Sequence, residues 1–177
     1  MPSRSKSVGH GEIVLKKGDI TEESVDVIAN AANSGLRGGG GVDGAIHRAA
    51  GSKLLKACRS LGRCPTGKAV LTPAFDLDAK YVAHAVGPRW RGGQNGESKL
   101  LSSAYKSCFE LAAEKGCSTI ALPSISTGVY GFPVEKASKI AMEEAENFLR
   151  EARSVQTIIF VLFDDETYSH FEKALVE

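Results

Sequence analysis

The chain has 177 residues, of which 42% are hydrophobic and 24% are charged, a composition that predicts one ordinary globular domain. Its 22 Lys and Arg residues nearly balance 21 Asp and Glu residues, so the net charge of +1 disfavours a dedicated nucleic-acid binder. The longest apolar run, Ile158 to Phe163, is too short to cross a bilayer.

The first half of the chain predicts alternating strands and helices. Residues 12–17 alternate between apolar and polar types, as in an edge or half-buried strand, and residues 25–31 form an apolar strand. Apolar residues recur at helical spacing over residues 42–61, which predicts one helix. Two short strands follow at residues 69–74 and 81–86, separated by a polar turn.

The middle of the chain continues the same alternation. A loop rich in glycine and arginine occupies residues 87–97, and a helix with one apolar face follows over residues 98–115. Residues 119–123 are a short buried strand. The next helix extends over residues 133–150 and begins with a proline, which suits the first position of a helix.

The last segment predicts a central strand and a terminal helix. Residues 155–163 are nearly all apolar, as expected of a strand covered on both faces. Asp164 and Asp165 are good caps for the helix that follows. We therefore predict an α/β fold, a three-layer α/β/α domain over residues 11–177, preceded by a flexible tail over residues 1–10.

Two glycine-rich segments lie between a strand and a helix. They are GGGGVDG at residues 38–44 and SISTGVYGF at residues 124–132. Glycine lets the backbone approach a ligand closely, and a helix N-terminus presents amide groups without partners to an anion. Strand ends of an α/β sheet are where ligands bind, so the two loops together favour a diphosphate ligand over two simple tight turns.

Neither common nucleotide motif accounts for these loops. Gly39, Gly41 and Gly44 match the spacing of a dinucleotide fingerprint, but no acidic residue occurs over residues 44–75 to hold a ribose. No Gly-Lys-Ser/Thr follows the glycines, which excludes a Walker A loop. The acid-free stretch carries several basic residues, either a solvated helix face or a feature that attracts anions.

The four cysteines, Cys58, Cys64, Cys108 and Cys117, form no CxxC pair. Their spacing suits neither a zinc site nor a redox motif, so we expect buried thiols and no bound metal. No apolar segment follows the charged N-terminus, so there is no sign of a secretory signal. We predict a cytoplasmic protein without a membrane partner.

Several longer motifs resemble the macrodomain family, and most closely its MacroD-type ADP-ribose hydrolases. The resemblance rests on GDIT at residues 18–21, VDVIANAAN at 25–33, GGGGVDGAIHRAAG at 38–51 and PSISTGVYGFP at 123–133. It extends over nearly the whole chain after residue 10, in the same order. It implies a macrodomain with a central mixed sheet, and binding of ADP-ribose without a cofactor.

The resemblance also implies which residues bind ADP-ribose. Asp19 accepts a hydrogen bond from the adenine amino group beside the backbone of Ile20, and Phe163 lies against the adenine ring. From the residues alone, Asp19 is equally a turn residue that caps a short helix, and Phe163 is equally a core aromatic. The diphosphate is held by the backbone of Gly40, Gly41, Val42, Ser126, Thr127, Gly128, Val129 and Tyr130. Tyr130 also forms a wall of the distal ribose site.

Asn33 and Asp43 are the catalytic residues that the resemblance implies. Asn33 binds the distal ribose hydroxyls, and Asp43 positions or partly deprotonates a water. A carboxylate near a helix N-terminus favours its ionised form, which makes Asp43 a weak base. The alternatives are that a substrate phosphate activates the water, or that Asn33 is a turn residue and Asp43 an N-terminal helix residue. We treat His47 as structural and His84 as a core histidine.

The predicted activity is hydrolysis of the ester between ADP-ribose and an acidic protein side chain, or of O-acetyl-ADP-ribose. The alternative is a module that binds ADP-ribose on proteins without turnover, because one fold serves both functions. A weaker alternative is binding of RNA or poly(ADP-ribose) through the basic helix and the loop at residues 89–96, where Arg-Gly-Gly occurs. Partners are thus ADP-ribose, ADP-ribosylated proteins and O-acetyl-ADP-ribose, with no nucleic acid expected and a monomeric state.

Overall fold

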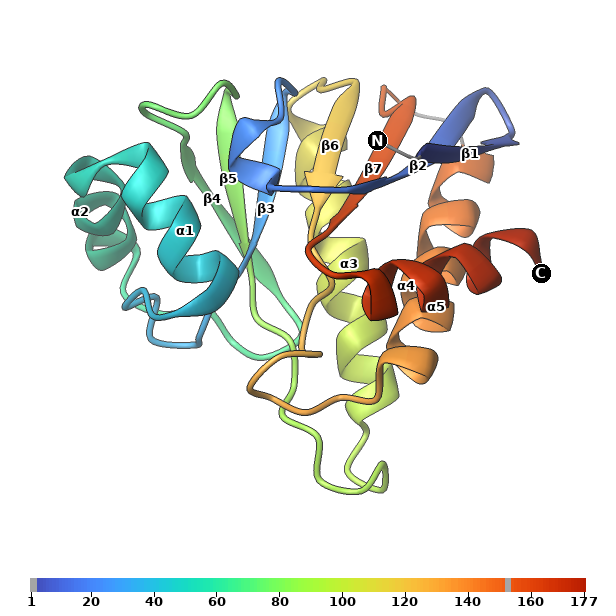
Figure 1. Cartoon of the computed structure of the whole chain (residues 1–177). Coiled ribbons are helices and arrows are strands. Elements are labelled where there is room, and N and C mark those ends of the chain that lie inside the picture. The colour runs from blue at the N-terminus through green and yellow to red at the C-terminus, as the bar shows by residue number, and fades with distance from the viewer. Residues whose placement is uncertain (1–2, 152–153) are drawn as a thin grey trace.

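The computed structural model describes residues 3–151 and 154–177, which form a seven-stranded mixed sheet with helices on both faces (Figure 1). The strands are β1 (Ser3–Val8), β2 (Gly11–Lys17), β3 (Val27–Ala31), β4 (Ala69–Pro73), β5 (Tyr81–Ala85), β6 (Thr119–Leu122) and β7 (Thr157–Leu162). The helices are the 3-10 turn η1 (Ile20–Glu22), α1 (Gly41–Ala50), α2 (Ser52–Leu61), α3 (Glu97–Glu114), α4 (Val134–Arg150) and α5 (Asp165–Val176). The predicted three-layer α/β/α class with a central mixed sheet is confirmed.

The strand order is β1-β2-β7-β6-β3-β5-β4. The five inner strands, β2, β7, β6, β3 and β5, are parallel to their neighbours within this group, whereas β1 and β4 pair antiparallel at the two edges. The carboxyl ends of the five parallel strands therefore meet at one edge of the sheet, where α/β proteins bind ligands.

Side chains of β7 alternate between the two hydrophobic layers, as the period of a strand requires. Phe160 packs in the cluster that contains residues of α3, α4 and α5, whereas Ile159 packs in the cluster that contains residues of α1 and α2. Figure 1 shows α1 and α2 on one face of the sheet and α3 and α4 on the other. Among the described residues no helix is long and apolar enough to span a bilayer.

The N-terminal segment corrects the predicted flexible tail. Residues 3–8 form β1, which pairs antiparallel with β2, and residues 1–2 lie outside the described residues. Its basic residues make ion pairs with two helices, Arg4 with Glu172 of α5 and Lys6 with Glu146 of α4, each at 2.7 Å. Polar and charged residues on an edge strand discourage pairing with other chains. Because the same residue types are common in solvated tails, the sequence of β1 resembles that of a tail. β2 is consequently an inner strand and not an edge strand.

The single helix predicted over residues 42–61 is two helices. Gly51 has a φ of 92° and ends α1 with its amide donating to the His47 carbonyl at 3.1 Å, and α2 begins at the next residue. A left-handed glycine is a common helix terminator, and the apolar spacing of the sequence continues across it. The predicted terminal helix is confirmed, because Asp164 caps α5 by accepting from the Thr167 amide at 2.8 Å.

Candidate functional site

The segments that follow the parallel strands are arranged in a row along the carboxyl edge of the sheet. Asp19 follows β2, Phe163 follows β7, residues 123–133 follow β6, residues 32–40 follow β3 and residues 86–96 follow β5. The loops after β5 and β6 gather at the lower end of the sheet in Figure 1. The strand order thus places Asp19 and Phe163 at one end of the row and the loop after β5 at the other.

Asp19 and Phe163 lie on neighbouring strands at the first end of the row. The Gly18 amide donates to the Leu162 carbonyl at 3.0 Å, which joins the two strand ends. Phe163 is 86% exposed, so the interpretation of Phe163 as a core aromatic is wrong and its ring is available to a ligand. Asp19 Oδ1 accepts from the Thr21 amide and hydroxyl, and thus caps η1. Ile20, the next residue, is buried.

The first glycine loop ends at the N-terminus of α1. In the described part of the chain, the amides of residues 39–42 donate to no protein acceptor. Gly41 has a φ of 57°, a backbone conformation that only glycine adopts without strain. A Cβ added at Gly40 or Gly41 would meet no atom within 4 Å, so open space lies in front of both. These features fit the anion cradle predicted from the sequence.

The second loop, Ser124 to Phe132, has the same properties on the neighbouring strand. No protein acceptor within the described ranges binds the amides of residues 126–130. Ser126 is buried with a φ of 68°, and its hydroxyl has no hydrogen-bond partner among the described residues. Strained, unsatisfied backbone of this kind is characteristic of ligand sites. A Cβ at Gly87 would collide with Ser126 Oγ, so Gly87 is required for the loops to pack.

Asp43 lies in the first turn of α1 and is only 6% exposed. Its Oδ1 accepts from Asn30 Nδ2 at 2.8 Å and faces His47 Nε2 at 3.4 Å. Among the described residues nothing binds Oδ2, and a Cβ added at Gly39 would lie 3.5 Å from it. One oxygen is thus anchored, and the other lies beside the glycine loop.

Burial raises the pKa of Asp43 above its usual value of 3.8, although the Asn30 hydrogen bond and the nearby His47 lower it. The expectation that the helix N-terminus makes Asp43 a weak base is therefore wrong, because desolvation of the carboxylate outweighs the stabilising groups. A carboxylate with a raised pKa is a better general base at neutral pH.

A buried polar chain on β3, β4 and β5 holds Asp43, and sequence reasoning did not identify it. Asn30 Nδ2 contacts His84 Nδ1 at 3.2 Å, and His84 Nε2 contacts Thr72 Oγ1 at 2.9 Å. Burial lowers the pKa of His84 to about 4, so the ring is neutral and carries its proton on Nε2, with Nδ1 accepting. The predicted core position of His84 is confirmed. The sequence offers one signal for this chain of contacts: Asn30 places a polar amide within an otherwise apolar strand.

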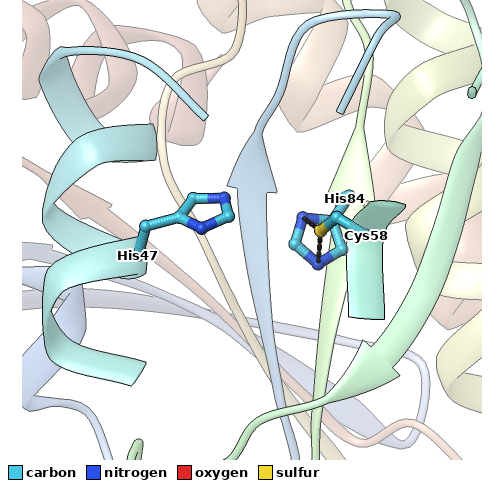
Figure 2. Close-up of side chains that lie close together, drawn as sticks. All are labelled: His47, Cys58 and His84. Carbon is cyan, nitrogen blue, oxygen red and sulfur yellow. Dashed lines mark hydrogen bonds between the residues drawn. The ribbon is translucent and has the colours of Figure 1, made fainter. Parts of the chain in front are cut away.

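His47, Cys58 and His84 each offer one donor atom within 4.8 Å of the others, and Figure 2 shows the Cys58 sulfur over the His84 ring. Both nitrogens of His84 are already engaged, by Asn30 and by Thr72. Burial raises the pKa of Cys58 to about 11, which keeps the thiol protonated, whereas a metal requires the thiolate. We therefore interpret this cluster as packing behind Asp43.

Asn33 shapes the loop after β3. Its side chain donates from Nδ2 to the Gly38 carbonyl at 2.9 Å and accepts at Oδ1 from the Arg37 amide at 3.0 Å. The turn role of Asn33 is thus present, and within the described residues it makes no hydrogen bond with Asp43. One amide hydrogen and one lone pair of the carbonyl remain for a ligand.

A cavity of about 370 Å³ lies next to the two loops, and Asn33 and Tyr130 are among the residues that line it. Three arginines that sequence reasoning did not assign to a site also line it, namely Arg37, Arg89 and Arg91. The structure therefore brings Asn33 and Tyr130 together at this cavity. Asp43, Asp19 and Phe163 do not line it.

A family model and two curated relatives all match this chain over more than half of its length. A family model described as Macro domain matches residues 29–141. A macro domain-containing protein of Chlorobaculum tepidum is 54% identical over 90% of this chain and 92% of its own length. A protein of Enterobacter cloacae named O-acetyl-ADP-ribose deacetylase is 51% identical over 94% of both chains.

One solved structure resembles the chain over nearly its whole length. The macrodomain of Oceanobacillus iheyensis with ADP has a TM-score of 0.95 and 40% identity, and the match covers 99% of this chain and 95% of that one. A variant of that macrodomain has also been solved with ADPR.

Proposed function

The chain belongs to the macro domain family, and we propose that it binds ADP-ribose along the carboxyl edge of its sheet and hydrolyses esters of ADP-ribose. One observation carries the proposal: two loops with free amides lie on neighbouring strands, beside a buried carboxylate with one unbound oxygen. The name of the Enterobacter relative, O-acetyl-ADP-ribose deacetylase, and the ligands of the Oceanobacillus macrodomain support it.

The order of groups along the edge supports one orientation of the ligand. Adenine stacks on the exposed Phe163 ring and donates its amino group to Asp19 Oδ2, beside the backbone of Ile20. The diphosphate lies between the amides of residues 40–42 and those of residues 126–130, where helix and loop dipoles stabilise its charge. The distal ribose then reaches Asn33 and Tyr130 at the entrance of the cavity.

Asp43 supplies the chemistry in this proposal. Its Oδ2 accepts a proton from a water molecule while Asn30 and His47 hold Oδ1 in place. Water adds, the ester bond between the ribose and the acyl group breaks, and the products are ADP-ribose and a free carboxylic acid. The remaining polar atoms of Asn33 orient the distal ribose. The acid is acetate for O-acetyl-ADP-ribose and a glutamate or aspartate side chain for a modified protein.

The test measures ADP-ribose release from a glutamate-linked mono-ADP-ribosylated protein and acetate release from O-acetyl-ADP-ribose. Asp43→Asn should lower both rates by about 100-fold or more, because a positioned general base contributes roughly 10² to 10⁴ in rate. Its affinity for ADP-ribose, measured by calorimetry, should stay within about threefold of the wild type, since the variant keeps the shape of the site.

The matched control is Asp78→Asn, which removes an exposed carboxylate from the β4–β5 turn at the opposite edge of the sheet and should leave both rates unchanged. Wild-type protein that binds ADP-ribose but releases no product from either ester would be a binding module, and the hydrolase proposal would be wrong. Full activity of Asp43→Asn would instead favour activation of the water by a substrate phosphate.

A further inference from the structure

The cavity at the far end of the row has a charge that the binding of ADP-ribose itself does not explain. Arg37 enters it from the loop after β3, and Arg89 and Arg91 enter it from the loop after β5. In the described part of the chain none of these three side chains forms an ion pair, and all three are exposed. Three guanidinium groups without an ion pair around one small cavity favour an anionic occupant.

Glu97 is the carboxylate that lines the same cavity, and among the described residues it forms no ion pair with the arginines. Its Oε2 accepts from the amides of Arg91 and Gly93, both at 2.9 Å, and its Oε1 accepts from the Asn95 amide at 2.6 Å. It is 2% exposed. The carboxylate is thus used to fold the loop after β5, so the guanidinium groups of the three arginines remain available to a ligand, and they outnumber the single carboxylate.

The loop that carries Arg89 and Arg91 is also fixed from its other side. The Trp90 amide donates to the Tyr130 carbonyl at 2.8 Å, and the Trp90 ring packs on Phe132 with centroids 4.8 Å apart. The Arg89 guanidinium lies 4.6 Å from the centre of the Tyr130 ring, a cation–π contact. These contacts order the loop backbone and the Arg89 side chain before any ligand arrives, which lowers the entropic cost of binding.

Resting on the proposed function, we infer that this cavity binds an acidic peptide segment next to the ADP-ribosylated residue, so that the enzyme prefers targets whose modified side chain lies among carboxylates. The position of the cavity supports this inference. Asn33 and Tyr130 are shared with the proposed distal ribose site, so a protein segment attached to that ribose is within reach of the arginines.

An acidic peptide fits the cavity better than a nucleic acid does. A volume of about 370 Å³ accommodates a few side-chain groups. A nucleic-acid surface needs an extended basic face, whereas the whole chain has a net charge of only +1. Planar guanidinium groups bind carboxylates through two parallel hydrogen bonds, which gives the site a means of selecting glutamate and aspartate.

The experiment compares three substrates at low and physiological salt. Two are peptides of equal length with one glutamate-linked ADP-ribose, flanked by glutamates in one peptide and by glutamines in the other. The third is O-acetyl-ADP-ribose, which carries no flanking segment. We expect kcat/KM to be about tenfold higher for the acidic peptide, mainly through KM, with the preference declining as salt rises.

Arg91→Gln tests the cavity, and Arg59→Gln, an exposed arginine on α2, is its matched control. Arg91→Gln should reduce the preference for the acidic peptide by about fivefold, the scale of an exposed ion pair, and leave hydrolysis of O-acetyl-ADP-ribose unchanged. Arg59→Gln should change neither quantity.

The outcomes separate the two proposals. No hydrolysis of any of the three substrates by the wild type would overturn the proposed function itself. Hydrolysis of all three substrates, with equal kcat/KM for the two peptides or no effect of Arg91→Gln, would overturn the acidic-segment site alone. Competition by single-stranded RNA at micromolar concentration, abolished by Arg91→Gln, would assign the cavity to a nucleic acid and also overturn the inference.

Discussion

The first turns of α1 and α3 each bury a carboxylate, and the structure surrounds the two groups in opposite ways. Asp43 of α1 has one side-chain amide donor, from Asn30, and burial raises its pKa. Glu97 of α3 accepts from three backbone amides of the preceding loop. Burial also raises the pKa of Glu97, but the amides outweigh it and lower the pKa from 4.5 to about 2.

The difference shows that the supply of donors, and not burial alone, decides what a buried carboxylate does. A carboxylate that accepts from several backbone amides is ionised at neutral pH and stabilises a loop. A carboxylate with one free oxygen and a raised pKa is costly to the fold but able to take a proton. Glu97 accordingly positions Arg91, whereas Asp43 is available for proton transfer.

Replacing Glu97 should give the larger change in stability. Glu97→Gln puts an amide group where three backbone amides need acceptors, and leaves at least one of them unsatisfied. The melting temperature at pH 7 should fall by about 5 °C for a chain of this size. Glu97 has a lowered pKa in the folded state, so its stabilisation is full above pH 4.5 and disappears as the pH falls toward 2.

Thermal unfolding from pH 7 down to pH 2.5 measures this effect. The difference between wild type and Glu97→Gln should narrow progressively below pH 4.5. A constant difference over the whole range would show that the carboxylate charge does not hold the loop after β5.

Asp43→Asn should change stability in the opposite direction and by less, about 2 °C at pH 7. The pKa of Asp43 is raised in the folded state, so folding is penalised as the pH rises above 3.8 and through that raised pKa. The asparagine can still accept from Asn30 Nδ2 but carries no charge. The variant should therefore be more stable than the wild type at pH 7 and equal to it below pH 3.8.

The same unfolding series, with Asp78→Asn as the exposed control, decides this prediction. A variant that is less stable than the wild type at neutral pH would mean that Asp43 contributes to the fold and not only to the site. A gain in stability together with a loss of hydrolysis would be the usual trade-off of an active site.

The contrast between the two carboxylates also explains how much the sequence could predict. Glycines before a helix are a local signal, so the positions of both loops followed from short motifs, whereas Asp43 was assigned to the site only through the family resemblance. Glu97 is likewise next to its loop, but its role depends on how residues 91–95 fold back over it. Arg89 contacts Tyr130, which is 41 positions later in the chain, and the hydrophobic periodicity of the sequence does not predict such a contact.

The buried chain behind Asp43 was beyond sequence reasoning for the same reason. Asn30, Thr72 and His84 come from three strands, and only the pairing of β3 with β5 and of β5 with β4 brings them together. The strand β1 was not predicted for another reason: its alternation of serine with basic residues is typical both of an edge strand and of a solvated tail. Gly51 divided a helix because a positive φ is invisible in the apolar pattern.

The smallest predicted effect tests whether the buried chain tunes Asp43. Thr72→Val removes the hydroxyl that His84 Nε2 contacts at 2.9 Å, which loosens the ring and, through it, Asn30. The hydrogen bond from Asn30 lowers the pKa of Asp43, so weakening it should move that pKa upward. As the pH falls, the rate of O-acetyl-ADP-ribose hydrolysis should begin to decrease at a slightly higher pH in the variant than in the wild type, with the plateau rate unchanged.

Thr157→Val on β7, which is outside this chain of contacts, should leave the whole pH profile unchanged. An identical acid limb in Thr72→Val and the wild type would show that Asn30 holds Asp43 without help from His84, whereas a lower plateau with an unmoved limb would assign Thr72 to packing alone.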